Sequence, residues 1–240
     1  MSAFAASLPV RTAALSTDAE GRTPDAASGN PTISRLGTIT AFDTAATTFG
    51  PGSANGKIRD VVTVNLATGA RTLVSDPGVG LPAANGPSTS PALSRDGSTV
   101  AFVSTASNLV AGDTNRAADV FVRDAAGTLT RVSVTSLGQE ANGDSGPPAI
   151  SGDGRFVVFS SRASNLVPND TNRTEDVFVH DRRTGTTSLV SVTPKGTSGS
   201  GRSSTPAISD DGAVVSFESL ARDLVSGDTN GVADVFVRNI

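Results

Sequence analysis

Residues 170–179, DTNRTEDVFV, decide the fold of this chain, because nearly the same sequence occurs twice more. It recurs as DTNRAADVFV at residues 113–122 and as DTNGVADVFV at residues 228–237. A polar loop that runs into an apolar strand, and that recurs at a fixed period, is typical of a repeat architecture. The repeat therefore predicts the fold directly, whereas it says little about the biological function.

The chain divides into four repeat units when the spacing between these copies is extended in both directions. Each unit begins with the pattern Pro-x-Ile/Leu-Ser, and the four prolines are spaced by 60, 57 and 58 residues: Pro31, Pro91, Pro148 and Pro206. We expect a single domain over residues 1–240, and its units are 31–90, 91–147, 148–205 and 206–240, the last together with 1–30.

The third unit shows the pattern of strands within a repeat. In order, we expect a strand over 148–151, a hairpin turn at Asp153-Gly154, a strand over 155–160, a long loop over 161–175, a strand over 176–181 and a strand over 187–193. Apolar residues occupy both faces of the two middle strands. Both faces must therefore be covered, as in small sheets that stack face to face.

The two ends of the chain indicate how such sheets could close into a ring. The last unit stops after its third strand, while residues 10–17, ahead of the first unit, resemble a fourth strand. We therefore expect an all-β fold, a four-bladed β-propeller of four-stranded antiparallel blades, whose ring is closed by an N-terminal strand that completes the last blade. An excised piece of a longer array is the alternative that this pattern leaves open.

The composition excludes several classes of function. The net charge is −4 and there is no basic run, so nucleic acid is not an expected partner. No apolar run approaches the roughly 20 residues of a membrane span, and the N-terminus has no signal-peptide pattern. The absence of cysteine excludes disulfides, thiolate metal sites and a cysteine nucleophile. We expect a monomer.

The repeated motif resembles that of a known family. Pro-Ala-Ile-Ser-x-Asp-Gly, a Phe-containing strand and then Asp-Val-Phe-Val resemble the WD40-like repeat of TolB-type β-propellers, closely in units two to four and loosely in unit one. The chain departs from that family where a Trp is replaced by Leu93, Ile150 and Ile208, and in its longer loop before the third strand. The resemblance implies a propeller, but such propellers serve as binding platforms, translocation scaffolds and enzyme gates.

One rim of the predicted propeller holds almost all the loop length. In a four-stranded meander, the loop between the second and third strands and the linker to the next unit leave the sheet at the same end. The other turns are short, and functional residues usually lie in long loops on a rigid scaffold. The elaborated rim is therefore the expected site for a protein partner or another ligand.

The DTN motif places oxygen ligands at positions 1, 3 and 7 of this rim loop, an arrangement by which hard cations such as Ca²⁺ are bound. The candidate ligands are Asp113, Asn115, Asp119, Asp170, Asn172, Asp176, Asp228, Asn230 and Asp234. The structural alternative is an Asx turn. Unit one supports that alternative, since it keeps Asn55 and Asp60 but has Ser53 in place of the first Asp. Sites with so few ligands would bind weakly and would fill where calcium is near millimolar, so we expect an extracytoplasmic setting.

Two classes of function remain open. The first is a non-enzymatic binding or scaffold module that uses its loop-rich rim, with bound calcium stiffening the loops. The second is a glycan-active or lyase-type enzyme that uses rim carboxylates, although His180 is the only histidine and is expected at an exposed strand end. A buried pair of carboxylates with raised pKa values would favour the enzyme, and loops with different side chains would favour the binder. A minimal propeller without activity of its own is a third possibility.

Overall fold

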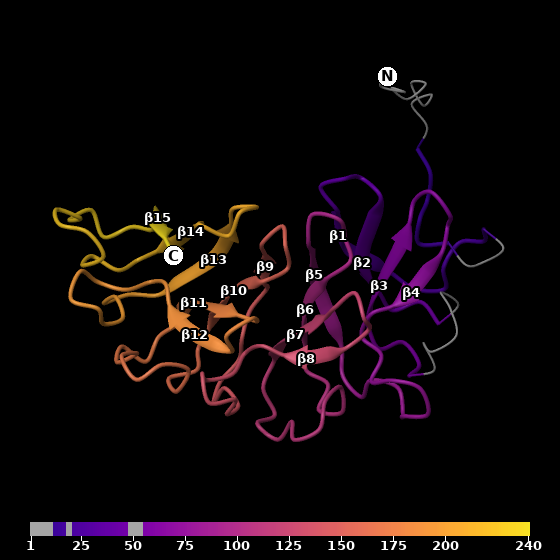
Figure 1. The fold of residues 1–240 in the computed structure, drawn as a ribbon, viewed down its shortest axis with the longest axis horizontal. Coiled ribbons are helices and arrows are strands. Elements are labelled where there is room, and N and C mark those ends of the chain that lie inside the picture. Colours follow the sequence, from indigo (N-terminus) through magenta and orange to yellow (C-terminus); the bar gives the residue numbers. More distant parts are fainter. Residues whose placement is uncertain (1–11, 18–20, 48–54) are drawn as a thin grey trace.

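The computed structural model describes residues 12–17, 21–47 and 55–240. Fifteen strands form four antiparallel sheets that follow one another along the chain (Figure 1). The first sheet contains β1 (Ser28–Ile33), β2 (Ile39–Thr44), β3 (Asp60–Asn65) and β4 (Arg71–Leu73), and the second contains β5 (Ser88–Leu93), β6 (Val100–Ser104), β7 (Asp119–Arg123) and β8 (Leu129–Arg131). The third contains β9 (Ala149–Ile150), β10 (Phe156–Ser161), β11 (Asp176–Asp181) and β12 (Thr186–Leu189), and the fourth contains β13 (Ser203–Ile208), β14 (Val214–Ser219) and β15 (Asp234–Asn239).

Each sheet is a meander in which neighbouring strands pair in sequence order, so the all-β prediction and the order of strands are confirmed. In the third sheet, β11 covers the predicted range 176–181, whereas the outer strand β12 ends at Leu189, earlier than predicted. The predicted hairpin is present, with Gly154 at φ 72°. A search of the described part of the chain for a helix long and apolar enough to cross a membrane found none.

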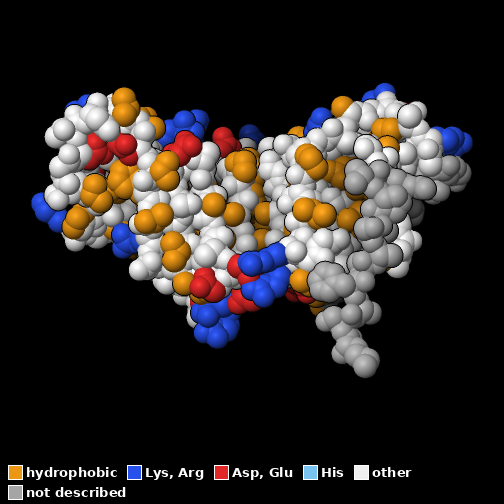
Figure 2. Space-filling view, turned by 90° about the horizontal axis from the view of Figure 1, so that it is seen from above, with side chains coloured by type: hydrophobic (Ala, Val, Ile, Leu, Met, Phe, Trp, Pro, Cys, Tyr) orange, Lys and Arg blue, Asp and Glu red, His pale blue; other side chains and the backbone are white. Residues whose placement is uncertain are grey.

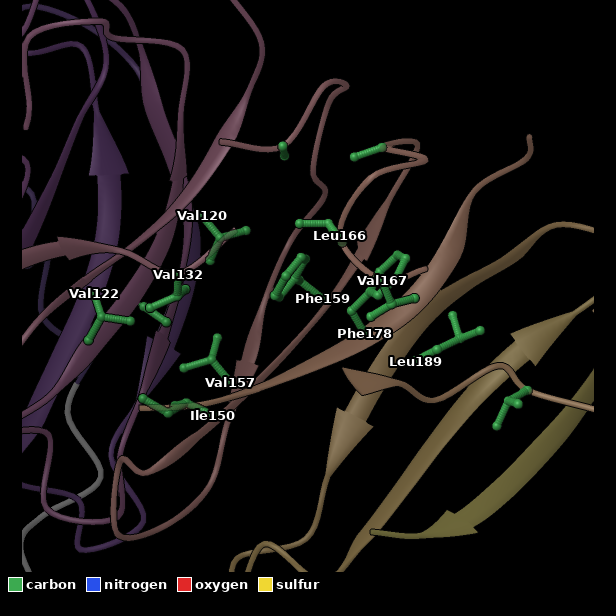
Figure 3. Packing of buried hydrophobic residues seen from close by; sticks show 14 residues of the cluster. Val120, Val122, Val132, Ile150, Val157, Phe159, Leu166, Val167, Phe178 and Leu189 are labelled. Carbon is green, nitrogen blue, oxygen red and sulfur yellow. The ribbon is translucent and has the colours of Figure 1, made fainter. Parts of the chain in front are cut away.

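The hydrophobic core lies between consecutive sheets. Val120 and Val122 of β7, together with Val132, face Val157 and Phe159 of β10 (Figure 3). All five side chains are at most 2% exposed. Phe121 of β7 and Val158 of β10, which belong to the clusters on the opposite faces of these strands, are also fully buried. The prediction that both faces of the middle strands are covered is therefore confirmed in the second and third sheets, and the stacked sheets have the arrangement of propeller blades.

A cross-strand pair of phenylalanines crosses each of the last three sheets. The ring centroids are 5.9, 6.1 and 5.8 Å apart in the pairs Phe102–Phe121, Phe159–Phe178 and Phe217–Phe236. Phe121 and Phe178 are fully buried, as the repeat predicts, while Phe236 of the fourth sheet is only partly buried. The phenylalanine of the third strand is thus fully buried where a fourth strand pairs with its own strand, and partly buried in β15, which has no such strand among the described residues.

The short hairpins between the first and second strands of the four sheets meet one another. The Leu36 N–H donates to the Arg95 carbonyl (3.1 Å), and the Arg95 N–H donates to the Gly152 carbonyl (3.0 Å). The Gly152 N–H in turn donates to the Asp210 carbonyl (2.8 Å), an approach so close that a Cβ at position 152 would collide with Asp210. Arg35 of the first sheet forms an ion pair with Asp210 (3.1 Å), so the first and fourth sheets are linked at these hairpins.

The predicted closure of the ring by an N-terminal strand is wrong for the part of it that the structure describes. Residues 12–17 form no strand, and Arg71 of β4 donates a hydrogen bond to the Thr17 hydroxyl (3.0 Å). Apart from their hairpins, the first and fourth sheets lie at opposite ends of the row (Figure 1). Thr17, at the end of the segment, is therefore held beside β4 and away from β15. Residues 10 and 11 of the predicted strand lie outside the described residues.

The fourth sheet is therefore open along one edge and one face. Within the described chain, β15 pairs only with β14. Val235 and Val237 are 74% and 75% exposed, although the equivalent Val120 and Val122 are fully buried. Apolar side chains accordingly reach the surface at the end of the molecule that carries the fourth sheet (Figure 2).

Equivalent valines should therefore contribute very differently to stability. Val177→Ala is expected to lower the free energy of unfolding by about 2 kcal/mol, because it removes buried methyl groups and leaves a cavity. Val235→Ala, at the same position of the open sheet, should change it by less than about 0.5 kcal/mol. Urea denaturation of both variants measures the difference, and equal losses would show that the fourth sheet is covered in solution.

Candidate functional site

The long loops and the linkers between sheets bind one another along one rim, as the meander predicts. Asn142, in the linker after the second sheet, accepts a hydrogen bond from the Ser164 N–H (2.8 Å) and donates to the Ser164 hydroxyl (3.0 Å). The corresponding pairs at the other two junctions are Asn85 with Ser107 and Ser200 with Arg222, whose N–H donates to the Ser200 hydroxyl (3.3 Å). Gly201, one residue further along its linker, approaches the next sheet so closely that a Cβ would lie 2.6 Å from the Leu220 carbonyl carbon. Hydrogen bonds and close packing thus fix the rim.

The Asn of the DTN motif organises its own loop. The Asn115 side-chain oxygen accepts the Ala117 N–H (2.9 Å), while its amide nitrogen donates to Asp119 (2.8 Å) and to the Ala141 carbonyl (3.0 Å). Between them, Arg116 adopts a left-handed conformation with φ 58°. Asn172 and Asn230 accept the corresponding N–H groups, and their loops turn at Arg173 (φ 58°) and Gly231 (φ 70°).

In the first three sheets, the Asp that begins the third strand is tied to the linker that follows its sheet. Ser133 donates a hydrogen bond to Asp119 (2.6 Å), and Ser191 donates to Asp176 (2.6 Å). In the first sheet, Ser75 donates to Asp60 in the same way (2.9 Å). Asp60 has this role in the unit that lacks the first Asp of the motif, which agrees with the structural interpretation of this residue. Ser53, which replaces that first Asp, lies outside the described residues.

In the second sheet, an arginine contacts the two carboxylates of the motif and a third from the linker. Nη1 of Arg131 lies 3.2 Å from Asp113, 3.5 Å from Asp119 and 2.7 Å from Glu140. The Arg131 and Asp113 side chains are only 8% and 4% exposed. Burial raises the pKa of both Asp113 and Asp119, and Arg131 opposes that rise. Hydrogen bonds from Thr114 and the contact with Arg131 lower the pKa of Glu140 to about 2.

In the third sheet, the same pair of carboxylates has no such cation. Asp170 is 8% exposed and Asp176 is fully buried. Among the described residues, no donor lies in hydrogen-bond geometry with either Asp170 carboxylate oxygen or with Oδ2 of Asp176, although the Asn172 backbone and side chain approach enough to lower the pKa of Asp170 and of Asp176 respectively. Burial raises the pKa of Asp176 to about 6, with a further contribution from the neighbouring Asp170 carboxylate. Burial also raises the pKa of Asp170 itself.

In the fourth sheet, the motif borders an open pocket. Asn230 donates a hydrogen bond to Asp234 (2.9 Å). Together with Asp228 and Phe236 these residues line a pocket of about 340 Å³. The pocket lies at the sheet that has only three strands among the described residues. The structure therefore places the candidate ligands of the three motifs in three different electrostatic environments.

His180 is not the exposed residue that its position predicts. It is 6% exposed, and its Nδ1 lies 2.9 Å from the Thr187 hydroxyl. Thr187 also donates to the Val134 carbonyl (2.5 Å), which belongs to the linker after the second sheet. That linker covers the end of β11, and burial lowers the pKa of His180.

Two residues of the site were not predicted from the motif, Arg131 and Glu140. The signal that could have found them is a comparison between repeats. Arg131 pairs with Phe121 across the strands, and the equivalent partner of Phe178 is Leu189. A charge at an otherwise apolar strand position therefore marks the site. Within the described ranges, no group of three or more Asp, Glu or His side chains is arranged to hold a metal, so a cation there would also need backbone or water oxygens.

Comparison with solved structures supports the propeller fold. TolB from Acinetobacter baumannii is 16% identical, with a TM-score of 0.50, and the match covers 91% of this chain and 47% of that protein. A putative TolB from Agrobacterium tumefaciens is 16% identical with a TM-score of 0.52, over 88% of this chain and 61% of that protein. The β-propeller domain of the Trilobed protease from Pyrococcus furiosus, described as having an open velcro topology, is 13% identical with a TM-score of 0.51, over 88% and 54% of the two chains.

These comparisons establish that the chain has a β-propeller fold. No family model matches the sequence, and no curated protein matches it. The chain spans about half the length of the solved structures named above. At this level of identity the likeness concerns the fold alone.

Proposed function

We propose that this chain is a non-enzymatic binding or scaffold module, which recognises a protein partner through its loop-rich rim in an extracytoplasmic setting. The observation that carries this proposal is the rigid presentation of exposed side chains on the rim. Arg116 and Arg173 are exposed, and both have left-handed backbone conformations that are unfavourable for arginine. Strained positions of this kind cluster at ligand-binding and switch sites.

The rim loops combine a shared framework with variable side chains, as expected of a binder. The Asn that fixes the turn is common to the loops, whereas the fifth residue of the motif is Ala117, Thr174 or Val232. Arg116 and Arg173 have Gly231 as their counterpart in the fourth sheet. A framework that is constant while its exposed positions vary supports recognition of an extended, asymmetric surface rather than of one small substrate.

The carboxylate pair that would favour an enzyme is present, but its burial argues against catalysis. Asp170 and Asp176 have raised pKa values, yet they are 8% and 0% exposed. A general acid or base must come within hydrogen-bond reach of its substrate. The pair that borders an open pocket is Asp228 and Asp234, and it supports the alternative of a glycan-active or lyase-type enzyme.

A binding experiment with matched rim variants tests the proposal. The immobilised protein is incubated with extracytoplasmic proteins of its source, and the bound proteins are crosslinked and identified by mass spectrometry. The wild type should retain a specific partner, and Arg116→Ala combined with Arg173→Ala should reduce its binding at least tenfold. Arg183→Ala is the control, because Arg183 is exposed in the turn between β11 and β12, on the opposite rim.

Equal binding by all three proteins would contradict recognition through this rim. The enzyme alternative has its own measurement, the appearance of reducing or unsaturated ends when purified protein is incubated with acidic and neutral polysaccharides. Cleavage that Asp234→Asn abolishes, in a variant that still folds, would replace the proposed function with the enzymatic one.

A further inference from the structure

The second and third sheets have the same carboxylate pair but differ at the position that supplies its positive charge. In the second sheet, one guanidinium nitrogen of Arg131 lies within 3.5 Å of both Asp113 and Asp119. One cation can therefore contact both carboxylates of this motif. The register places Leu189 at the position of Arg131 in the third sheet, and a leucine side chain carries no charge.

The contacts between loop and linker around the pair are the same in both sheets, whereas the hydrogen bond from Asn115 to Asp119 (2.8 Å) belongs to the second sheet. The Thr114 N–H donates to Glu140 in the second sheet (2.8 Å), and the Thr171 N–H donates to the Ser198 hydroxyl in the third (2.9 Å). The Asn amide likewise donates to a linker carbonyl in both sheets, at 3.0 and 2.7 Å. The third sheet thus keeps the loop and the linker in place without Arg131 and without Glu140.

Three carboxylate oxygens are left without hydrogen-bond partners in the third sheet. They are both oxygens of Asp170 and Oδ2 of Asp176, and each is inaccessible to solvent. A buried carboxylate without a partner is costly, since the charged group loses its hydration and gains nothing in exchange. Two adjacent carboxylates with three free oxygens are a donor set that suits a hard divalent cation.

We propose that the third sheet binds a divalent cation of the calcium class between Asp170 and Asp176, at the place where the Arg131 guanidinium lies in the second sheet. The two carboxylates supply the protein's charged ligands. Backbone carbonyls and water complete the coordination shell, because the Asn172 side-chain oxygen already accepts the Thr174 N–H. This site does not depend on the rim having a protein partner.

The proposed cation site is specific to the third sheet. The second sheet has its own cation in Arg131. In the fourth sheet, Oδ1 of Asp228 is also buried without a partner, but Asp228 and Asp234 line an open pocket that water can enter. Of the nine candidate ligands predicted from the repeat, Asp170 and Asp176 are therefore the pair in which both residues are buried and both have oxygens without a hydrogen-bond partner.

Calcium titration of the full chain tests this assignment. Equilibrium dialysis with radioactive calcium should give one site per chain for the wild type. At a calcium concentration ten times Kd, Tm should be about 3–6 °C higher than in chelator. Leu189→Arg should place a guanidinium between the carboxylates, as in the second sheet, and should abolish both calcium uptake and the calcium-dependent shift in Tm.

Two further variants separate this proposal from a general effect of charge. Asp170→Asn should abolish calcium uptake, whereas Asp113→Asn, at the equivalent position of the second sheet, should leave the stoichiometry unchanged. Magnesium chloride and sodium chloride at matched ionic strength serve as controls for screening. A wild type that takes up no calcium, or a Leu189→Arg variant that folds and still binds it with unchanged affinity, would overturn the assignment.

Discussion

Phe178→Ala is expected to lower the free energy of unfolding by about 3–5 kcal/mol. The Phe178 ring is fully buried, stacks on Phe159 with centroids 6.1 Å apart, and belongs to the core between the second and third sheets. Truncation to alanine removes the ring from contact with both sheets and leaves a cavity. Urea denaturation followed by circular dichroism measures the loss as a shift of the unfolding midpoint.

Phe236→Ala is the matched control for this prediction. Phe236 lies at the equivalent position of β15 and packs on the third sheet, but β15 is an edge strand among the described residues, and the ring lines an open pocket and is only partly buried. Phe236→Ala should lower the free energy of unfolding by less than half as much as Phe178→Ala does. A cost for Phe236→Ala equal to that for Phe178→Ala would contradict the open end of the array.

Arg131→Leu should destabilise the protein by about 3–5 kcal/mol in chelator, because it leaves buried carboxylates without a counter-charge. The guanidinium contacts Asp113, Asp119 and Glu140, and the first two of these side chains are at most 4% exposed. When one partner of a buried ion pair is removed, the other charge stays buried without a compensating interaction, and its full desolvation cost then destabilises the fold. Thermal and urea denaturation in chelator both measure it.

Neutralisation of the carboxylates provides the internal control. Arg131→Leu combined with Asp113→Asn and Glu140→Gln should recover part of the loss, since fewer buried charges are left unpaired. Calcium should also stabilise the Arg131→Leu variant more than it stabilises the wild type. A variant that is as stable as the wild type in chelator would show that Arg131 has no structural role.

Most of the fold could be predicted from the repeat, because its signals are local. The short apolar runs locate β10 and β11, the Asp-Gly pair locates the hairpin before β10, and the repeat copies both onto the other units. The closure of the ring was predicted wrongly because it depends on which of two distant sheets the N-terminal segment joins. Residues 12–17 resemble an outer strand in sequence, but Thr17 hydrogen-bonds to Arg71 of the first sheet.

The candidate site could be predicted less completely, since its character depends on contacts between loops and linkers. The motif predicted that Asp170 and Asp176 belong to one loop. It did not predict that the side chain of Asn172 would hydrogen-bond to backbone groups, or that Arg131 would contact the equivalent carboxylates, Asp113 and Asp119. His180 was misjudged for the same reason, because a linker from the preceding unit covers it.

The open fourth sheet has a consequence for the dynamics of the chain. In an array whose members contact mainly their neighbours, local stability is approximately a sum over adjacent interfaces. The third sheet is covered on both faces and the fourth on one. Sub-global opening should therefore begin at β15 and proceed inward, so that amide protection against hydrogen exchange rises in steps from the fourth sheet to the third. The chain is then a graded series of cooperative units, of which the last can exchange on its own.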